Sequence, residues 1–334
     1  MVDNYKKYIE DISNNTNFIT STIEKVERLL SILEWVNSHE MLSNSLVLKG
    51  GTAINTVIFN FPRLSVDIDL DLSNIFLKND MLKFKETSNK LLLNYLKANG
   101  YNVNSKKSKN TYALNSIVAE YTDIKGNIDN IKIEINYMKR THILATKQLN
   151  VNTNVFPDKN FKINCVNPIE IYADKICALL NRITARDLFD VYTLSKYGLF
   201  DESEKQLLRQ CFLFEYIAVN NYKLDNLNIN NIKQISQKDI NTKLLPTLRD
   251  RNPQKHDLNI MVNDVQNYLN DIIYIDDKTN EFYNNFQKGI YQPELLFSDT
   301  DILKRVNKHP MVLWKLNNSS NGRTININLI NKSF

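Results

Sequence analysis

The amino-acid sequence predicts a mixed α/β fold, with a small mixed sheet in its first half and a mainly helical second half. Two observations carry this prediction. Strand-like runs are confined to residues 46–138, and from residue 168 onward the apolar residues recur at helical spacing. The chain has 334 residues, of which 43% are hydrophobic, so it can bury two ordinary cores. We therefore expect two domains, residues 1–165 and residues 166–334.

The first half alternates between helix and strand signals. A short apolar run is a buried strand candidate, and the residues that follow Gly50 and Gly51 place their apolar side chains on one helical face. Lys125-Gly126-Asn127 has the chemistry of a hairpin turn. The expected order is a helical region over 5–38, a strand over 46–48, a helix over 53–61, a strand over 65–71, a helix over 80–98, and strands within 111–122 and 130–138.

The second half is predicted to be mostly helical. Residues 168–182 and 184–198 both place apolar side chains at helical spacing. Thr184 can cap the second of these helices, and Gly198 can end it. A polar, Asn-rich stretch at 220–243 is the best candidate for a loop or linker.

Charge and cysteine content bound the class of protein. Lys and Arg exceed Asp and Glu by 42 to 37, and this net charge of +5 tolerates a polyanionic partner without requiring one. The three cysteines, Cys165, Cys177 and Cys211, lack the spacing of a metal site or a disulfide framework. Neither a signal peptide nor a run of about 18 apolar residues is found. We expect a soluble, cytoplasmic protein with no membrane partner.

The segment over residues 65–71, SVDIDLD, contains three aspartates separated by single apolar residues. In a strand, this alternation puts Asp67, Asp69 and Asp71 on one face. Such carboxylates either line a solvated sheet edge or bind Mg²⁺, which in turn bridges phosphates. Gly50 and Gly51 precede them at a strand-to-helix junction, where a phosphate can approach the backbone closely. Together the two motifs favour metal-assisted nucleotidyl transfer.

Two further carboxylates are open to more than one interpretation. Asp71 either supports the pair Asp67 and Asp69 or ends the strand in solvent. Glu134 lies on the polar face of the strand expected over 130–138. It either joins the aspartates as a third metal ligand or faces solvent.

Two polar motifs resemble the signatures of the AbiEii/AbiGii toxin family. The first matches the family's LKGGTAL and RFSEDIDL elements, and the second matches a helical lysine followed by R-D-x-x-D. This family belongs to the DNA polymerase β-like nucleotidyltransferase superfamily, so the resemblance implies that fold, completed by a helical C-terminal domain. The segments that carry it are 48–53 (LKGGTA), 63–69 (RLSVDID), 174–180 (DKICALL), 186–190 (RDLFD), 292–297 and 309–315, within roughly residues 45–316.

The resemblance implies roles for individual residues. Asp67 and Asp69 match the metal-binding pair, with Glu134 as the open third ligand. Asp187 and Asp190 match the acidic residues of the last motif, one of which deprotonates the attacking hydroxyl. Taken without the resemblance, the same helix could simply be solvated. The residues implied to contact the nucleotide are Gly50, Gly51, Thr52, Ser65, Lys175 and Arg186, with Lys175 also counted as catalytic.

The implied reaction is Mg²⁺-dependent transfer of a nucleoside monophosphate from an NTP to an acceptor hydroxyl, with pyrophosphate leaving. The family implies a toxin, an antitoxin encoded beside it, and a role in phage abortive infection or plasmid maintenance. In the related MenT toxins the acceptor is the 3′ end of tRNA, which makes RNA the expected acceptor. Two alternatives stay open: transfer to a protein side chain, and a non-catalytic regulator that binds NTP.

Basic and aromatic residues outside these motifs are candidates for further contacts with nucleic acid. Cations in two loops either hold a nucleic-acid backbone or are solvated. The sixteen tyrosines include candidates for stacking on bases, although most are expected in the core. The cations in question are Lys106, Lys107, Lys109, Arg249 and Arg251.

Overall fold

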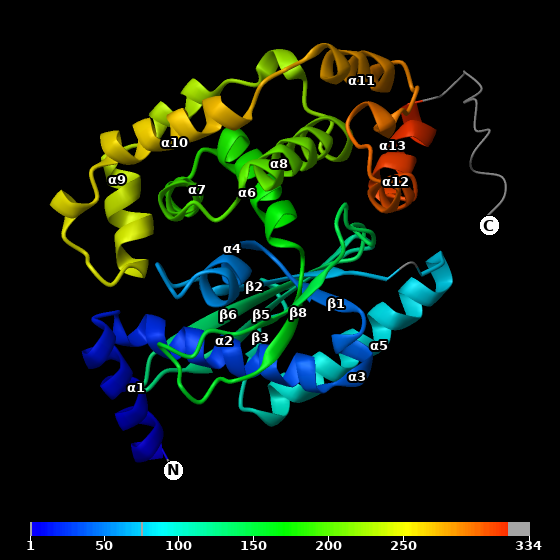
Figure 1. Cartoon of the computed structure of the whole chain (residues 1–334). Coiled ribbons are helices and arrows are strands. Elements are labelled where there is room, and N and C mark those ends of the chain that lie inside the picture. The colour runs from blue at the N-terminus through cyan, green and yellow to red at the C-terminus, as the bar shows by residue number, and fades with distance from the viewer. Residues whose placement is uncertain (1, 75, 320–334) are drawn as a thin grey trace.

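The computed structural model describes residues 2–74 and 76–319 and contains one mixed sheet beneath a layer of helices (Figure 1). Its strands run in the order β3-β5-β6-β2-β1-β8-β7, with β4 paired to β5. This architecture confirms the predicted mixed α/β class. The strands are β1 (Leu46–Leu48), β2 (Asp67–Leu72), β3 (Asn102–Val103), β4 (Lys109–Asn110), β5 (Leu114–Thr122), β6 (Ile128–Asn136), β7 (Lys147–Asn150) and β8 (Lys162–Cys165).

We call the described residues up to Cys165 the sheet lobe. Its longest helices are amphipathic, and α2 packs across β2, β6 and β8. Helix α4 continues directly into a π-helical turn, η1, on the other side of β2. The helices of this lobe are α1 (Val2–Thr16), α2 (Thr20–Ser38), α3 (Glu40–Ser43), α4 (Gly50–Ala53), η1 (Ile54–Ile58) and α5 (Lys78–Ala98).

We call the described residues from Pro168 onward the helical lobe, and a division into two domains near residue 165 stays a prediction. The end of that predicted domain, residues 320–334, lies outside the described residues. The α-helices of this lobe are α6 (Pro168–Arg182), α7 (Ala185–Tyr197), α8 (Glu202–Phe214), α9 (Gln237–Asp239), α10 (Leu258–Ile272), α11 (Asp277–Gln287), α12 (Thr300–Val306) and α13 (Pro310–Ser319). Its shorter turns are η2 (Glu215–Val219), η3 (Leu224–Asn226), η4 (Ile229–Gln234), η5 (Ile240–Leu244), η6 (Leu245–Thr247), η7 (Pro253–Lys255) and η8 (Pro293–Leu295).

Strand β2 lies near the centre of the sheet, antiparallel to β1 and parallel to β6. Ile68, Leu70 and Leu72 are buried on the face covered by α2. Because side chains alternate along a strand, Asp67 and Asp69 project from the opposite face, toward α4 and the helical lobe. The sheet therefore presents carboxylates where the two lobes meet.

Local pattern predicted the long elements better than the short ones. The β5–β6 hairpin is confirmed, with Gly126 at φ +85° in its turn. Strands β3, β4, β7 and β8 were not predicted, because each is at most four residues long and is held by hydrogen bonds to its neighbour rather than by an apolar pattern of its own. The Asn-rich stretch at 220–243 forms short helical turns rather than an extended linker.

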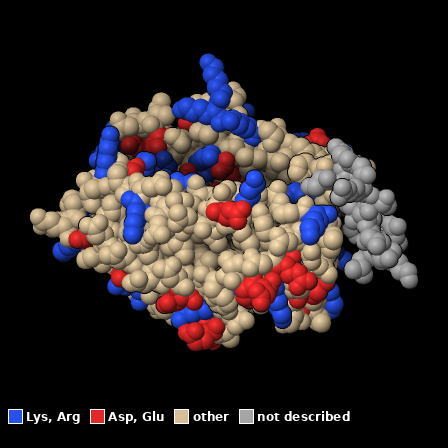
Figure 2. Space-filling view, turned by 90° about the horizontal axis from the view of Figure 1, so that it is seen from above, with Lys and Arg blue, Asp and Glu red and all other residues tan. Residues whose placement is uncertain are grey.

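Polar contacts join the lobes. Lys139, just after β6, pairs with Asp174 of α6 at 2.8 Å and with Glu215 of η2 at 2.7 Å. The backbone amide of Leu64 donates to the carbonyl of Thr247 at 2.8 Å. Seen from above, acidic and basic side chains lie together in a hollow of the surface (Figure 2). In the described ranges, no helix combines the length and the apolarity needed to cross a membrane.

Candidate active site

Three carboxylates line up on two neighbouring strands of the sheet. Asp69 of β2 stands directly beside Glu134 of β6 in the parallel register, and Asp67 lies two residues earlier on the same face. The pKa of Asp69 lies above its ordinary value. Burial is the main cause and the like charges of Asp67 and Glu134 add to it, while the positive charge of Lys49 acts in the opposite direction. Glu134 also pairs with Lys132 at 2.9 Å. The register therefore brings Glu134 beside the aspartates, which the interpretation of Glu134 as a third metal ligand requires.

Asp71, the third aspartate of β2, differs from this group because it is buried and a lysine pairs with it. Its side chain is fully buried, and Lys49 pairs with it at 2.6 Å. The interpretation in which Asp71 ends the strand in solvent is therefore wrong. A buried carboxylate held by a lysine anchors β2 against the residue that precedes α4, and it supports the site from behind.

Gly50 and Gly51 bring the backbone close to these carboxylates. Gly50 has φ +68°, and a Cβ there would lie 2.7 Å from Oδ2 of Asp69. A Cβ on Gly51 would meet Arg63 at 2.8 Å and the hydroxyl of Ser65 at 3.1 Å. A side chain at either position would therefore displace a polar side chain of the site, and the positive φ of Gly50 favours glycine for its backbone conformation as well.

The first turn of α4 has free backbone donors. Within the described part of the chain, no side chain caps this helix, so its first amides are open to an anion. The hydroxyl of Thr52 instead donates to the carbonyl of Asp67 at 2.5 Å, which fixes α4 on β2. Thr52 thus supports this turn through its side chain without facing the open end of the helix.

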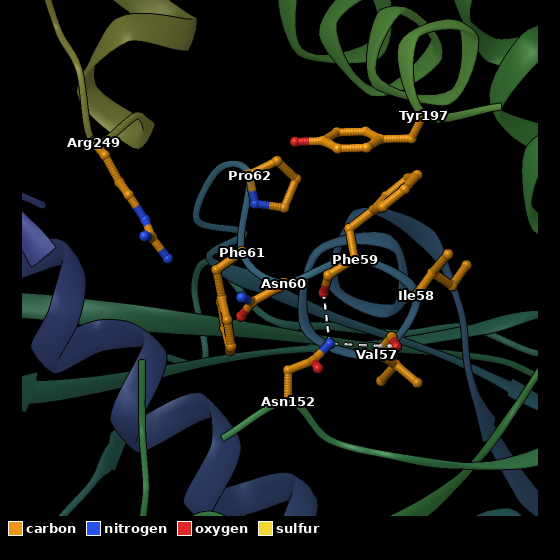
Figure 3. A pocket seen from close by; sticks show the side chains of 9 residues that line it. All are labelled: Val57, Ile58, Phe59, Asn60, Phe61, Pro62, Asn152, Tyr197 and Arg249. Atoms are coloured by element: carbon orange, nitrogen blue, oxygen red, sulfur yellow. Dashed lines mark hydrogen bonds between the residues drawn. The ribbon is translucent and has the colours of Figure 1, made fainter. Parts of the chain in front are cut away.

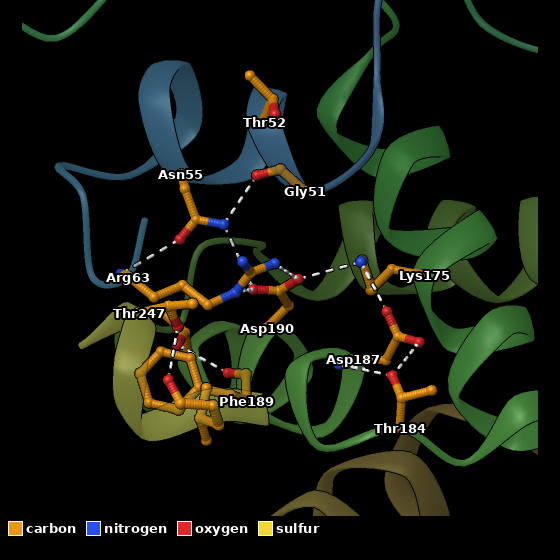
Figure 4. A network of polar contacts seen from close by, with 12 residues as sticks. Gly51, Thr52, Asn55, Arg63, Lys175, Thr184, Asp187, Phe189, Asp190 and Thr247 are labelled. Carbon is orange, nitrogen blue, oxygen red and sulfur yellow. Dashed lines mark hydrogen bonds and ion pairs between the residues drawn. The ribbon is translucent and has the colours of Figure 1, made fainter. Parts of the chain in front are cut away.

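The lysine and the two aspartates of the second motif form one buried network (Figure 4). Lys175 of α6 pairs with Asp187 at 2.8 Å and with Asp190 at 3.0 Å, both on α7. Each aspartate is only 1% exposed, so the alternative of a solvated helix is excluded. Lys175 also lowers the pKa of Asp69, which indicates that its charge acts on the carboxylate face of the sheet.

Arg63 ties this network to the sheet lobe. Its guanidinium binds Asp190 in a two-pronged pair, with Nε to Oδ1 at 2.8 Å and the second nitrogen to Oδ2 at 2.7 Å. Asn55 of η1 donates to the carbonyl of Gly51 at 2.8 Å and to Asp190 at 3.4 Å. One carboxylate of the helical lobe thereby holds both the loop before β2 and the helix that begins at Gly50.

Asp187 is held by cations and by the cap of its own helix. Arg182 donates to it at 2.6 and 2.9 Å, and the hydroxyl of Thr184 donates at 2.7 Å. Burial alone raises the pKa of Asp187, but Lys175 and Arg182 hold it well below its ordinary value. Arg186 makes no ion pair within residues 2–74 and 76–319 and is partly exposed on the same helix.

The donor set suits a hard divalent cation. In the described ranges, no three acidic, histidine or cysteine side chains are gathered closely enough to enclose a metal ion by themselves. Mg²⁺, however, usually binds through one or two carboxylates and completes its coordination with substrate phosphates and water. Asp67 and Asp69, on one face beside the glycine turn, fit that arrangement.

Sequence reasoning missed four residues of this site: Lys49, Asn55, Arg63 and Arg182. Arg63 carried a readable signal, because it stands between the apolar residues Pro62 and Leu64, and a guanidinium buried in such a segment needs a carboxylate partner. Lys49 borders the glycine motif, but its partner is set by the antiparallel register of β1 and β2. Asn55 and Arg182 gave no signal in the sequence, because their partners, Asp190 and Asp187, belong to another helix.

Comparison with known proteins bears on the family and the fold. A family profile described as nucleotidyl transferase AbiEii toxin, type IV TA system, matches residues 31–277. No curated protein matches the chain. Among solved structures, the chain is similar to MenT4, a nucleotidyltransferase toxin from Mycobacterium tuberculosis H37Rv, with a TM-score of 0.57 and 13% sequence identity over 91% of this chain and 98% of that chain. At this identity, the likeness concerns the fold.

Replacement of Gly50 by alanine tests the close contact with Asp69. Gly100 also has positive φ, at +79°, but an added Cβ there meets nothing within 4 Å, so Gly100→Ala is a matched control for backbone strain. Gly50→Ala should lower the free energy of unfolding by about 1–3 kcal/mol more than Gly100→Ala, because its Cβ displaces the carboxylate. Urea denaturation measures both, and equal losses would show that the contact carries no energy.

The charge of Asp187 should make stability depend on pH. Its pKa is depressed in the folded chain, so its contribution is complete at neutral pH and is lost as pH falls below the unfolded value of about 3.9. Asp187→Asn should therefore lower the unfolding free energy by about 3 kcal/mol at pH 7, and this gap should shrink below about pH 4.

The control for this measurement is Asp271→Asn, because Asp271 is exposed and makes no ion pair in the described ranges. It should change the free energy of unfolding by less than about 0.5 kcal/mol throughout. A gap between the parent and Asp187→Asn that stays constant into acid would contradict the assignment.

Proposed function

The chain belongs to the AbiEii family of nucleotidyltransferase toxins of type IV toxin–antitoxin systems, and on this premise we propose that it transfers a nucleoside monophosphate from an NTP to a hydroxyl of an RNA acceptor. The reaction uses a divalent metal, which we take to be Mg²⁺. The 3′ end of tRNA is the acceptor that we favour. The oxygen of the acceptor attacks the α-phosphorus, the bond from that phosphorus to the β-bridging oxygen breaks, and pyrophosphate leaves.

One observation carries the proposal: Asp67, Asp69 and Glu134 occupy one face of paired parallel strands, beside a glycine turn that has room for no side chain. Three like charges in this position are unfavourable unless a cation neutralises them. The open amides of α4 lie next to them. Carboxylates and backbone donors in this order suit a metal–triphosphate substrate better than either feature does alone.

We assign the metal to Asp67 and Asp69, with Glu134 beside them. When bound, the metal neutralises charge on the phosphate oxygens and orients the triphosphate. Gly50 and Gly51 contact the phosphates through their amides, and Ser65, against Gly51, borders the same space. Lys175 supplies a fixed positive charge toward the phosphates.

The two aspartates of α7 are better suited to hold cations than to accept a proton. Both carboxylates accept from Lys175, and Asp190 also accepts from Arg63. Burial opposes their ionisation, but these cations lower the pKa of both groups, so each is a weak base. We therefore propose that Asp187 and Asp190 position Lys175. We propose that Glu134, which is partly exposed and whose cation partner Lys132 is itself partly exposed to solvent, accepts the proton of the attacking hydroxyl.

The family implies a neighbouring antitoxin, and we propose that the toxin acts in phage abortive infection or plasmid maintenance. Cys165, Cys177 and Cys211 are free and buried. Free thiols are typical of a reducing compartment, which supports action in the cytoplasm. The net charge of +5 is compatible with an RNA acceptor.

The assay for this proposal combines the purified protein with Mg²⁺, each labelled NTP in turn, and total tRNA or cell extract. We expect label on RNA, dependent on added metal and abolished by a chelator. Asp67→Asn should reduce labelling by about a hundredfold or more, because the metal loses a ligand while the half-exposed position tolerates an amide. Lys175→Met should do the same, with its unfolding transition measured to confirm that it folds.

The matched control is again Asp271→Asn, which should label RNA like the parent. Label on protein would replace the RNA acceptor by a protein side chain. Tight NTP binding without label on either would support the non-catalytic regulator. Labelling by Asp67→Asn equal to that of the parent would contradict the metal site.

A further inference from the structure

A pocket lies between the lobes, and none of the carboxylates on β2 and β6 lines it. It has a volume of about 620 Å³, within the range of pockets that hold small ligands. The loop after η1 and Asn152 form its lower wall, while Tyr197 and Arg249 reach it from the helical lobe (Figure 3). None of the residues assigned to the metal, the phosphates or proton transfer lines it. The residues that do are Val57, Ile58, Phe59, Asn60, Phe61, Pro62, Asn152, Tyr197 and Arg249.

Two aromatic rings lie beside each other at this pocket, the exposed ring of Tyr197 and the half-buried ring of Phe59. The ring centroids of Phe59 and Tyr197 are 5.3 Å apart, with an interplanar angle of 39°. Tyr197 is 70% exposed, although large aromatic side chains are usually mostly buried. An exposed ring that leans on a second ring at the mouth of a cavity is the arrangement on which unpaired bases stack.

Arg249 brings an uncompensated positive charge to the same pocket. Its neighbour Asp250 is already paired with Lys255 at 2.7 Å, and Arg249 has no acidic partner within residues 2–74 and 76–319. The guanidinium lies 5.2 Å from the ring centroid of Phe18. The side chain of Asn17 donates to the backbone carbonyl of Arg249 at 3.0 Å. These contacts hold the arginine in place without neutralising it, so it can bind a phosphate.

The asparagines add polar groups to the pocket. The amide nitrogen of Asn152 donates to the carbonyl of Phe59 at 2.7 Å, which fixes the loop. Asn60 is exposed, and its side chain makes no hydrogen bond within the described ranges. A free amide beside stacked rings and an arginine can bond the edge of a base.

The pocket is coupled to the candidate active site through shared elements. Pro62 lines it, and the next residue, Arg63, binds Asp190. Helix α7 likewise carries Asp190 in its middle and Tyr197 at its end. The α4–η1 helix spans about 10 Å between the glycine turn and the pocket, a length that about three stacked nucleotides cover.

We propose that this pocket binds an unpaired nucleotide of the RNA acceptor, a few residues before its reacting end. The base stacks on Tyr197 and Phe59, and Arg249 contacts a phosphate. The pocket thereby directs the 3′ hydroxyl toward the carboxylates. This inference rests on the proposed function for the identity of the acceptor.

The test measures binding of a fluorescein-labelled, single-stranded RNA by fluorescence anisotropy, without NTP. Tyr197→Ala should weaken binding about tenfold through loss of stacking, whereas Tyr197→Phe should bind like the parent. Arg249→Ala should weaken binding and reduce the slope of log affinity against log salt by about 1. Tyr112→Ala and Lys308→Ala, which change exposed residues outside the pocket, should stay within about twofold of the parent.

Kinetics separate this inference from the proposed function. In the transfer assay, Tyr197→Ala should raise KM for RNA and leave KM for NTP unchanged. If the parent labels RNA and Tyr197→Ala matches it in both affinity and KM, the pocket proposal is wrong and the proposed function stands. If RNA binding depends on Tyr197 but no RNA is labelled, the pocket proposal stands and the proposed function fails. If Tyr197→Ala impairs labelling of protein but not RNA binding, the pocket takes a peptide and the inference is overturned.

Discussion

The buried ion pair between Arg63 and Asp190 is the constraint on which the site depends. It joins the loop before β2 to helix α7, and both side chains are almost fully buried. A buried charge is tolerated only with a partner of opposite sign and good geometry, so separating Arg63 from Asp190 costs free energy and the pair holds the two segments together. Because Asp190 also binds Lys175, the same pair fixes where that cation lies relative to Asp69. Loss of the pair would therefore disturb the lobe contact and the site together.

The distribution of charge along β2 explains why one end of the strand is structural and the other is suited to a ligand. Asp71 is buried and matched by Lys49, so its charge is neutralised within the protein. Asp67 and Asp69 stand toward the open end, beside Glu134, and the like charges of Asp67 and Glu134 raise the pKa of Asp69. Under the proposed function, a metal bound with a triphosphate would add positive charge beside these carboxylates. Burial and pairing with Lys49 thus distinguish Asp71, an anchor, from the two aspartates on the same face that are suited to a ligand.

The sequence alone predicted what depends on local pattern. The alternating aspartates, the glycine turn, the β5–β6 hairpin and helices α6 and α7 could all be predicted, because each follows from spacing or turn chemistry within a short segment. The short edge strands and the partners of Lys49, Arg63 and Asp71 could not, because register and packing between distant segments decide them. The sequence implied that Asp187 or Asp190 accepts a proton, whereas their buried ion pairs with Lys175 support our proposal that they position this lysine.

A double-mutant cycle on Arg63→Met and Asp190→Leu measures the central interaction most directly. Each single variant should lose about 3–5 kcal/mol of unfolding free energy. Arg63→Met leaves the buried Asp190 with Lys175 as its remaining cation, and Asp190→Leu removes the carboxylate that binds the buried guanidinium of Arg63. The double variant should lose much less than the sum, with a coupling energy of about 3 kcal/mol, and nucleotidyl transfer should stay impaired because Lys175 has lost Asp190. Additive losses, or a double variant with the activity of the parent, would contradict the account.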